Sequence, residues 1–348
     1  TLTISGSTAI DGGLTVTTGT LTVSGSTVIG GDLILNAGTL NFTAPDVSFS
    51  GALTVSGGTL NLTGAYAKPP QPSSLVLAAG ASLNLVNTVG QHVNLGAGTL
   101  NLGAGTGSAT FSLELGSGSN YDRISATGNA TTANTVVLNL SAIGGFGAGN
   151  YDLLSAGTGL GGATYTVTGL TGSSLAGYAL SLSAGDSLVR LTSSAVTGDF
   201  YWDGTLGTTT WASFNSTSLQ TNWSTDAAGD TNVRAIPGLH RVIFSSDDVT
   251  GTSLSTTLDA AFSIKDLVFN NQRGSGPLTA ITIATGTGGS LKLTPGTAAD
   301  GINLQAGAPA AVTISAPLAL GADQTWTVAD AATTLTVSGA LTGTYGLT

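Results

Sequence analysis

Residues 19–42 read GTLTVSGSTVIGGDLILNAGTLNF, and this stretch decides the fold. It contains short runs rich in leucine, valine, isoleucine and threonine at 21–23, 27–29 and 33–35, and the first run starts again at Leu40. Side chains of a strand point alternately to its two faces, so a run such as LTV predicts a short β-strand with one buried and one solvent-facing side. The glycines between the runs predict corners, because glycine reaches positive φ without steric cost.

The first run returns along the first hundred residues at a nearly fixed spacing. Strands this short cannot bury a core within a hairpin, whereas stacking copy upon copy buries the leucines in one internal ladder. The pattern therefore predicts an all-β chain, a parallel β-helix (β-solenoid) with about 20 residues per coil. The predicted structural ladder consists of the leucines that begin successive copies, namely Leu2, Leu21, Leu40, Leu60, Leu83 and Leu100.

The pattern divides the chain into four parts. Residues 1–110 are predicted to form regular coils, and residues 111–198 a looser continuation or a cap with longer strands. The segment 199–248 holds three of the four tryptophans and several aspartates, so we expect it to interrupt the solenoid and to start a second unit. Residues 249–348 return to the ladder and predict a second solenoid stretch that continues beyond this sequence.

Two details refine this organisation. In the second stretch, Ile281 and Ile302 are predicted to lie one full coil apart, and so are Leu291 and Val312. In the first stretch, the proline-rich segment 65–74 cannot supply ladder donors, so we expect a loop inserted at a corner rather than a binding loop.

The composition excludes several classes of function. The 348 residues include no cysteine and carry a formal net charge of −10 with only eight lysines and arginines. Disulfides and thiolate chemistry are therefore excluded, and binding to nucleic acid or to anionic lipid lacks its main attractive term. No apolar run approaches the ~20 residues that span a membrane. The sequence opens at Thr1 without a signal segment, which predicts a piece of a longer polypeptide.

Three further stretches carry recognisable phrases. Residues 335–348 read LTVSGALTGTYGLT, residues 121–191 contain YDRISATGNA, GNYDLLSAGTG and LSLSAGDSLVRL, and residues 200–224 contain FYWDG and NWS. They resemble passenger regions of autotransporters that carry autotransporter-associated β-strand repeats. The likeness is to the repeat phrase, to the segment that ends many passenger helices, and to the tryptophan-bearing start of another repeat block. The resemblance implies a right-handed parallel β-helix, exported to the bacterial cell surface, with adhesion or scaffolding as its usual role.

Candidate catalytic residues are few. His92 and His240 lie far apart in the sequence, and we expect both to be structural. Polysaccharide lyases and hydrolases also use parallel β-helices and would need a pair of acids on one exposed face. A role in turns or in solvent is the stronger interpretation for each available pair, and adjacent residues of a strand point to opposite sides. These pairs are Asp199 with Asp203, Asp226 with Asp230, and Asp247 with Asp248.

A glycine-rich dinucleotide pattern occurs at Gly157, Gly159 and Gly162, but a strand phrase follows it, whereas a phosphate cradle needs a helix start. The chain is therefore predicted not to be an enzyme and to bind no organic cofactor.

Two groups of side chains remain as candidates for binding. Asp226, Asp230 and Asn232 lie close together in the sequence and could offer hard oxygen ligands to calcium, although the nonapeptide calcium repeat is missing. An aromatic group could stack on sugar rings, but as hydrophobic anchors the same residues would close the end of a solenoid, and this second interpretation is the stronger. The candidate carbohydrate-binding residues are Tyr201, Trp202, Trp211 and Trp223.

Together these patterns predict an extracellular, non-catalytic rod, fibre or matrix component of the bacterial surface. Its repetitive face suits many weak contacts to cell-surface glycans or to host and matrix surfaces. A second expected partner is a further copy of the chain, because unpaired strand edges can template pairing. The alternative functions are a polysaccharide-binding module and a polysaccharide-degrading enzyme on the same scaffold.

Overall fold

The computed structural model describes residues 1–64, 66, 70–170, 175–244, 249, 251–270, 278–296 and 300–348. Regular structure in these ranges is β-strand, apart from a short 3₁₀ helix at Leu160–Gly162, so the all-β prediction is confirmed. Within the same ranges, no helix is both long and apolar enough to cross a membrane. The chain forms two compact units. Unit 1 comprises Thr1–Leu170 and Ser181–Ser193, and unit 2 comprises Thr171–Leu180 and Ser194–Thr348.

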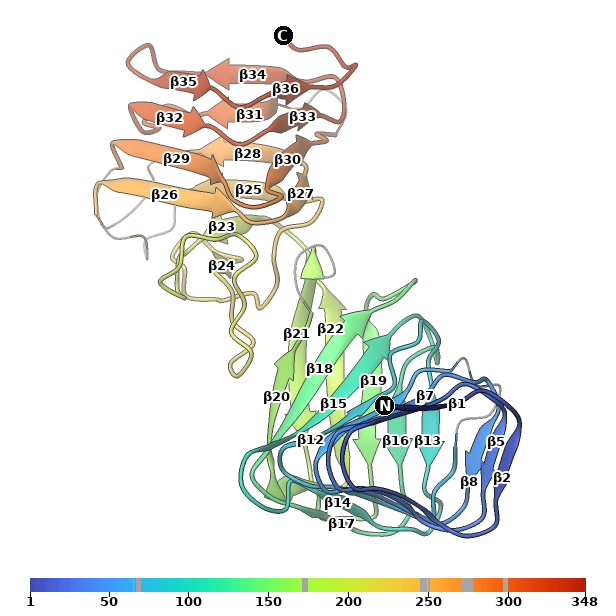
Figure 1. Cartoon of the computed structure of the whole chain (residues 1–348). Coiled ribbons are helices and arrows are strands. Elements are labelled where there is room, and N and C mark those ends of the chain that lie inside the picture. Colours follow the sequence, from blue (N-terminus) through green and yellow to red (C-terminus); the bar gives the residue numbers. More distant parts are fainter. Residues whose placement is uncertain are drawn as a thin grey trace. The chain divides into compact units, whose positions relative to one another are not determined.

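Unit 1 is built from parallel sheets whose neighbouring strands are mostly three strands apart in the sequence (Figure 1). The largest has, in spatial order, β1 (Leu2–Ile4), β4 (Thr20–Val23), β7 (Thr39–Phe42), β10 (Gly58–Leu62), β12 (Ala81–Asn84), β15 (Ser108–Leu115), β18 (Thr135–Ala142) and β20 (Thr164–Thr168). A second has β17 (Ala130–Thr132), β14 (Leu100–Leu102), β11 (Ser74–Leu77), β9 (Ala52–Val55), β6 (Leu33–Leu35) and β3 (Leu14–Val16). A third has β2 (Thr8–Ile10), β5 (Thr27–Ile29) and β8 (Val47–Phe49).

A fourth sheet follows the order β13 (His92–Asn94), β16 (Arg123–Ser125), β19 (Gly149–Ser155), β22 (Leu188–Ala195) and β21 (Tyr178–Ala184). Its first pairs are parallel, but β19 and β22 run antiparallel. The parallel stacking elsewhere is consistent with a β-solenoid, and the antiparallel pair ends that regularity. The strands β18, β19, β21 and β22 have seven or eight residues each, more than the three to five residues of the strands from β1 to β14.

The predicted leucine ladder runs through the largest sheet for five of its six members. Leu2 pairs with Leu21, Leu21 with Leu40, Leu40 with Leu60, and Leu60 with Leu83. From Leu21 onward these side chains are buried, while the residues that follow them on the strands, such as Thr22, face outward. Burying one aliphatic side chain is worth about 1.5–3 kcal/mol, so the ladder contributes to the stability of this part.

The prediction that Leu100 is the sixth member of this ladder is wrong. Leu83 pairs with Phe111, whereas Leu100 pairs with Leu75 and Ala130 in the second sheet. The reason is spacing: Leu83 and its partner Phe111 are 28 residues apart, against 19 to 23 residues for the earlier pairs of the ladder, so Leu100 falls on the third strand of this interval, β14. The same Gly-Thr-Leu phrase therefore falls on another side of the stack.

The glycine corners are required by close packing between successive copies of the repeat. Gly19, Gly38 and Gly58 all have positive φ, between 76° and 85°. A Cβ atom on Gly38 would lie 2.1 Å from the carbonyl oxygen of Gly19, and a Cβ on Gly58 would lie 2.1 Å from that of Gly38. Of the predicted proline-rich loop, residues 65 and 67–69 lie outside the described part of the chain.

Unit 2 contains three further sheets, again largely parallel (Figure 1). One has β24 (Trp223–Ser224), β23 (Phe200–Trp202), β25 (Arg241–Phe244), β28 (Asp266–Phe269), β31 (Asp300–Leu304) and β34 (Thr325–Val328). Another has β26 (Ser253–Leu258), β29 (Ala280–Thr285), β32 (Ala311–Ile314) and β35 (Thr334–Val337). The last has β27 (Ala261–Ile264), β30 (Ser290–Leu293), β33 (Leu318–Leu320) and β36 (Leu341–Thr342).

The coil length expected in unit 2 is wrong, because it is too short. Ile281 pairs with Val312 rather than with Ile302, and Leu291 pairs with Leu318 rather than with Val312. Ile281 and Ile302 belong to different sheets. Successive strands from β25 to β36 belong to three sheets in turn before the chain returns to the first sheet, and this lengthens each coil.

Candidate functional site

The three tryptophans of the segment 199–248 form an internal aromatic cluster with Phe244, which we call the tryptophan cluster. Trp202 is 1% exposed, and Trp211 and Trp223 are 0% exposed. The ring of Trp223 lies 5.0 Å from each of the other two indoles, close to perpendicular to both. These rings offer no face to a sugar, so carbohydrate binding by the three tryptophans does not fit this geometry, whereas a role as hydrophobic anchors does.

Hydrogen bonds hold the tryptophan cluster in place. The indole N–H of Trp211 donates to the hydroxyl of Thr256 over 3.0 Å, and that of Trp223 donates to the carbonyl of Trp211 over 2.9 Å. Tyr201, the fourth candidate, points the other way from β23 and is half-buried. Burial is the largest cause that raises the pKa of its phenol, and nearby Asp199 acts in the same direction.

Two of the predicted calcium ligands, Asp226 and Asn232, have side-chain oxygens that accept backbone N–H groups of the surrounding loops. The carboxylate of Asp226 accepts backbone N–H groups from Gly229, Asp230 and Thr231 at 2.9–3.1 Å. Burial acts to raise the pKa of Asp226, but these hydrogen bonds and one from Ser224 outweigh it and hold the pKa below its usual value.

The side chain of Asn232 is likewise held by hydrogen bonds to the loops around it. Its side-chain oxygen accepts the backbone N–H groups of Thr221 and Arg234 at 3.2 and 3.1 Å. In the described part of the chain, no three histidines or acidic residues lie close enough together to hold a metal ion. The segment thus has the geometry of a hydrogen-bonded turn.

His92 lies on the outer face of β13, in register with Arg123 on β16. Its Nε2 atom is 2.7 Å from the hydroxyl of Ser125, and burial, followed by the charge of Arg123, lowers its pKa. On the same sheet, Arg190 forms a two-pronged ion pair with Asp152. These contacts tie neighbouring strands together, which is a structural role for His92.

The remaining sequence candidates are also placed by structural contacts. Asp203 is buried, and its carboxylate accepts the backbone N–H of Thr205 at 2.9 Å, so it does not form an exposed pair with Asp199. Asp247 and Asp248 lie outside the described residues. The glycine pattern ends at Gly162, which is the last residue of the short 3₁₀ helix, and β20 follows, so no long helix starts there to cradle a phosphate.

A charged site that sequence analysis missed lies where three parallel strands begin side by side. Asp199 directly precedes β23, Arg241 begins β25, and Asp266 begins β28. The pairings of Phe200 with Val242 and of Arg241 with Asp266 place the three charged residues side by side at the amino-terminal ends of their strands. The sequence indicates this site only weakly: in DFYW (199–202), RVIF (241–244) and DLVF (266–269), a charged residue stands immediately before three mostly apolar residues.

These residues line a cavity of about 480 Å³, which we call the polar pocket. The guanidinium Nε of Arg241 lies 2.8 Å from the carboxylate of Asp266, whose side chain is 7% exposed. Burial raises the pKa of Asp266, although the hydrogen bond from Arg241 opposes the shift. The other lining residues are Val196, Thr197, Gly198, His240 and Lys265.

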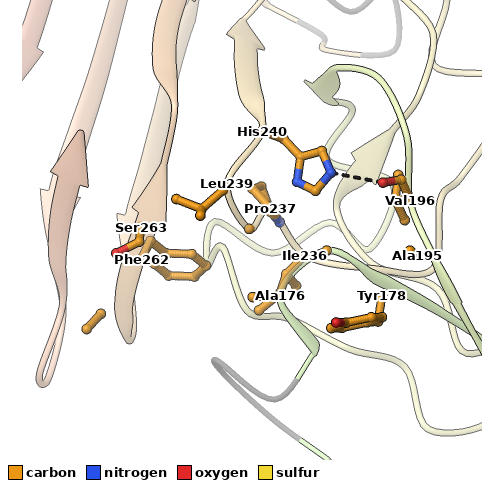
Figure 2. Close-up of a pocket in the computed structure, with 13 residues that line it drawn as sticks. Ala176, Tyr178, Ala195, Val196, Ile236, Pro237, Leu239, His240, Phe262 and Ser263 are labelled. Atoms are coloured by element: carbon orange, nitrogen blue, oxygen red, sulfur yellow. Dashed lines mark hydrogen bonds between the residues drawn. The ribbon is translucent and has the colours of Figure 1, made fainter. Parts of the chain in front are cut away.

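A second cavity of about 450 Å³ shares Val196 and His240 with the polar pocket and is mostly apolar; we call it the apolar pocket (Figure 2). His240 Nε2 lies 3.0 Å from the carbonyl oxygen of Val196, and because a carbonyl only accepts, we assign the proton to Nε2. The imidazole also packs edge-on against Phe200, at 4.9 Å between ring centres. His240 thus lines both cavities in a fixed orientation.

Comparison with known protein families, curated proteins and solved structures gives no match for this chain. The resemblance to autotransporter passengers therefore depends on the sequence phrases alone.

Proposed function

We propose that this chain is an extracellular, non-catalytic stretch of a bacterial surface protein that acts as a rod, fibre or matrix component. The observation that carries the proposal is the register of the parallel sheets in unit 1. Each leucine of the ladder from Leu2 to Leu60 pairs with the leucine of the next copy, so the sequence repeat produces a stack of equivalent strands. Such stacking suits a protein that works through length and repeated weak contacts.

The finer architecture belongs to the same proposal. We propose that residues 1–110 wind as a right-handed β-helix of about 20 residues per coil, in the manner of autotransporter passengers. The pairing of Leu21 with Leu40, and of Leu40 with Leu60, supports the coil length. The handedness follows from the resemblance, and an experimental structure of the chain would test it.

The test of function uses purified chain on surfaces coated with neutral polysaccharides, acidic polysaccharides or matrix proteins, with reducing ends measured in the same wells. Retention of the folded chain on at least one surface without release of reducing ends is expected. Heat-unfolded chain is the control for nonspecific sticking. Release of reducing ends, or retention no better than that of the unfolded control on every surface, contradicts the proposal.

The polar pocket favours one second candidate, a polysaccharide-degrading enzyme. Asp266, whose burial raises its pKa, and the nearby Asp199 are the pair of carboxylates that such chemistry would use. If reducing ends are released in the same assay, Asp199→Asn should abolish the release while the Asp230→Asn control retains it. Asp230 is an exposed aspartate of the same unit outside this pocket.

We also propose that further copies of the chain are partners. The support for this partner is the in-register parallel stacking of strands in both units, such as β4 on β7 and β29 on β32. An open strand edge can add a strand from another chain. Sedimentation velocity over a hundredfold range of concentration should show association, and a single unassociated species throughout contradicts this partner.

A further inference from the structure

We propose that the polar and apolar pockets of unit 2 together bind a neutral pyranose, that is, a sugar ring without ionised groups. The proposal goes beyond the rod or matrix role, because stacked coils need no pocket to act as a structural element. All residues that line the two cavities belong to unit 2.

The polar pocket offers both donors and acceptors at its surface. The carboxylates of Asp199 and Asp266 accept hydrogen bonds, while the guanidinium of Arg241 and the ammonium of Lys265 donate them. A sugar hydroxyl both donates and accepts, so neighbouring hydroxyls can use both kinds of group at once. Arg241 and Asp266 are already aligned by their 2.8 Å contact and need little reorganisation to receive a ligand.

Charge balance selects a neutral ligand over a charged one. The formal charges of Asp199 and Asp266 cancel those of Arg241 and Lys265 within the polar pocket. A carboxylated or sulfated sugar would be attracted by Lys265 but repelled by Asp199, and an amino sugar would meet the reverse. Electrostatic complementarity suppresses wrong partners in this way, so a hydroxyl-rich ligand without charge fits best.

The apolar pocket supplies a surface for the C–H face of the ring. Leu239 is 57% exposed there, and Tyr178 lines the same cavity from β21 (Figure 2). The exposed leucine side chain can therefore pack against the C–H face of a sugar ring. Cavities of about 450 and 480 Å³ lie within the range of roughly 300–1,000 Å³ that is usual for small-molecule sites.

The test uses methyl β-glucoside, methyl β-galactoside and methyl α-mannoside as probes, with glucuronic acid and glucosamine as charged counterparts. Binding to the purified chain is measured by saturation-transfer NMR and by calorimetry. At least one neutral glycoside should bind, and it should bind more tightly than either charged sugar. Absence of binding by all three neutral glycosides, or tighter binding of a charged sugar, overturns the proposal.

Variants locate the binding. Asp199→Asn and Leu239→Ser should each weaken the affinity by about fivefold or more, as expected for loss of one polar or apolar contact. Lys265→Gln, at an exposed position, provides a third change that should leave folding intact. Affinity unchanged in all three variants overturns the proposal.

Each variant has a matched control outside the pockets in the same unit, namely Asp230→Asn, Leu341→Ser and Lys292→Gln. All three control positions are exposed, and their affinity should equal that of the unmodified chain. Tryptophan fluorescence checks folding, because the tryptophan cluster lies in unit 2. The monosaccharide assay can fail while retention on polymer surfaces persists, so the two proposals are distinguishable.

Discussion

At the scale of single residues, the tryptophan cluster should dominate the stability of unit 2. Trp223 is fully buried and contacts Trp202, Trp211 and Phe244. Trp223→Ala should lower the free energy of unfolding by about 3–5 kcal/mol, since it removes packing and leaves a cavity. Denaturant unfolding followed by circular dichroism measures the change. The control is Trp326→Ala, a partly exposed tryptophan of the same unit; an equal loss there would contradict the prediction.

Asp122 should make unit 1 less stable as the pH rises. Its buried carboxylate accepts backbone N–H groups from Gln91 and Glu114, yet burial dominates and raises its pKa to about 8. The folded state therefore holds this proton more tightly than the unfolded state does. Stability is greatest below the usual aspartate pKa and falls as the pH rises through the folded value.

The melting temperature of unit 1 should accordingly decrease between pH 5 and pH 9 by an amount that Asp122→Asn reduces. The measurement is thermal unfolding followed by circular dichroism. The transition of unit 1 is the one that tryptophan fluorescence does not detect. Asp11→Asn, at an exposed position, is the matched control and should retain the full slope. A slope that is the same in all three proteins would rule out Asp122 as its source.

At the scale of the strands, a row of polar side chains on the outer face of the largest sheet should stabilise stacking. The side-chain amide of Asn61 donates to Asn41 over 2.7 Å and accepts from Asn84 over 2.9 Å. Asn41 continues the row by donating to the hydroxyl of Thr22 over 3.0 Å. The row runs along pairs of residues that are in register on β4, β7, β10 and β12.

Asn61→Ala removes two of these hydrogen bonds and should cost about 1–3 kcal/mol of unfolding free energy. The control Thr54→Ala changes an outward-facing residue of β9 in a neighbouring sheet and should cost less than Asn61→Ala. Chemical unfolding of unit 1, monitored by circular dichroism, distinguishes the two variants. Equal stability of Asn61→Ala and the unmodified chain would show that the row is not stabilising.

At the scale of the whole molecule, the division into two units predicts two unfolding events. All four tryptophans belong to unit 2, so intrinsic tryptophan fluorescence reports on that unit alone, whereas circular dichroism reports on strands in both. Each unit has its own buried core, and separate cores need not unfold together. Denaturant curves from the two probes should therefore not coincide, with the extra circular dichroism transition assigned to unit 1. Superimposable curves would indicate a single cooperative unit.

What the sequence determined by itself was local and repetitive: the short strands at 21–23, 27–29 and 33–35, their parallel stacking, and the leucine columns while the spacing stayed regular. These follow from side-chain alternation and from glycine corners, which neighbouring residues specify. The tertiary structure alone decided the partners once the spacing varied, as for Leu100 and Ile281.

The polar pocket could not be predicted from the sequence for the same physical reason, because strand pairing in the folded chain decides which residues meet. Its acids and bases at 199, 241 and 266 are far apart along the chain and meet only because β23, β25 and β28 pair in parallel and begin at one sheet edge. Likewise, the sequence around a tryptophan does not show whether its side chain faces solvent or the core. Only the packing around 202, 211 and 223 decided that these rings are buried, since burial depends on neighbours contributed by distant strands.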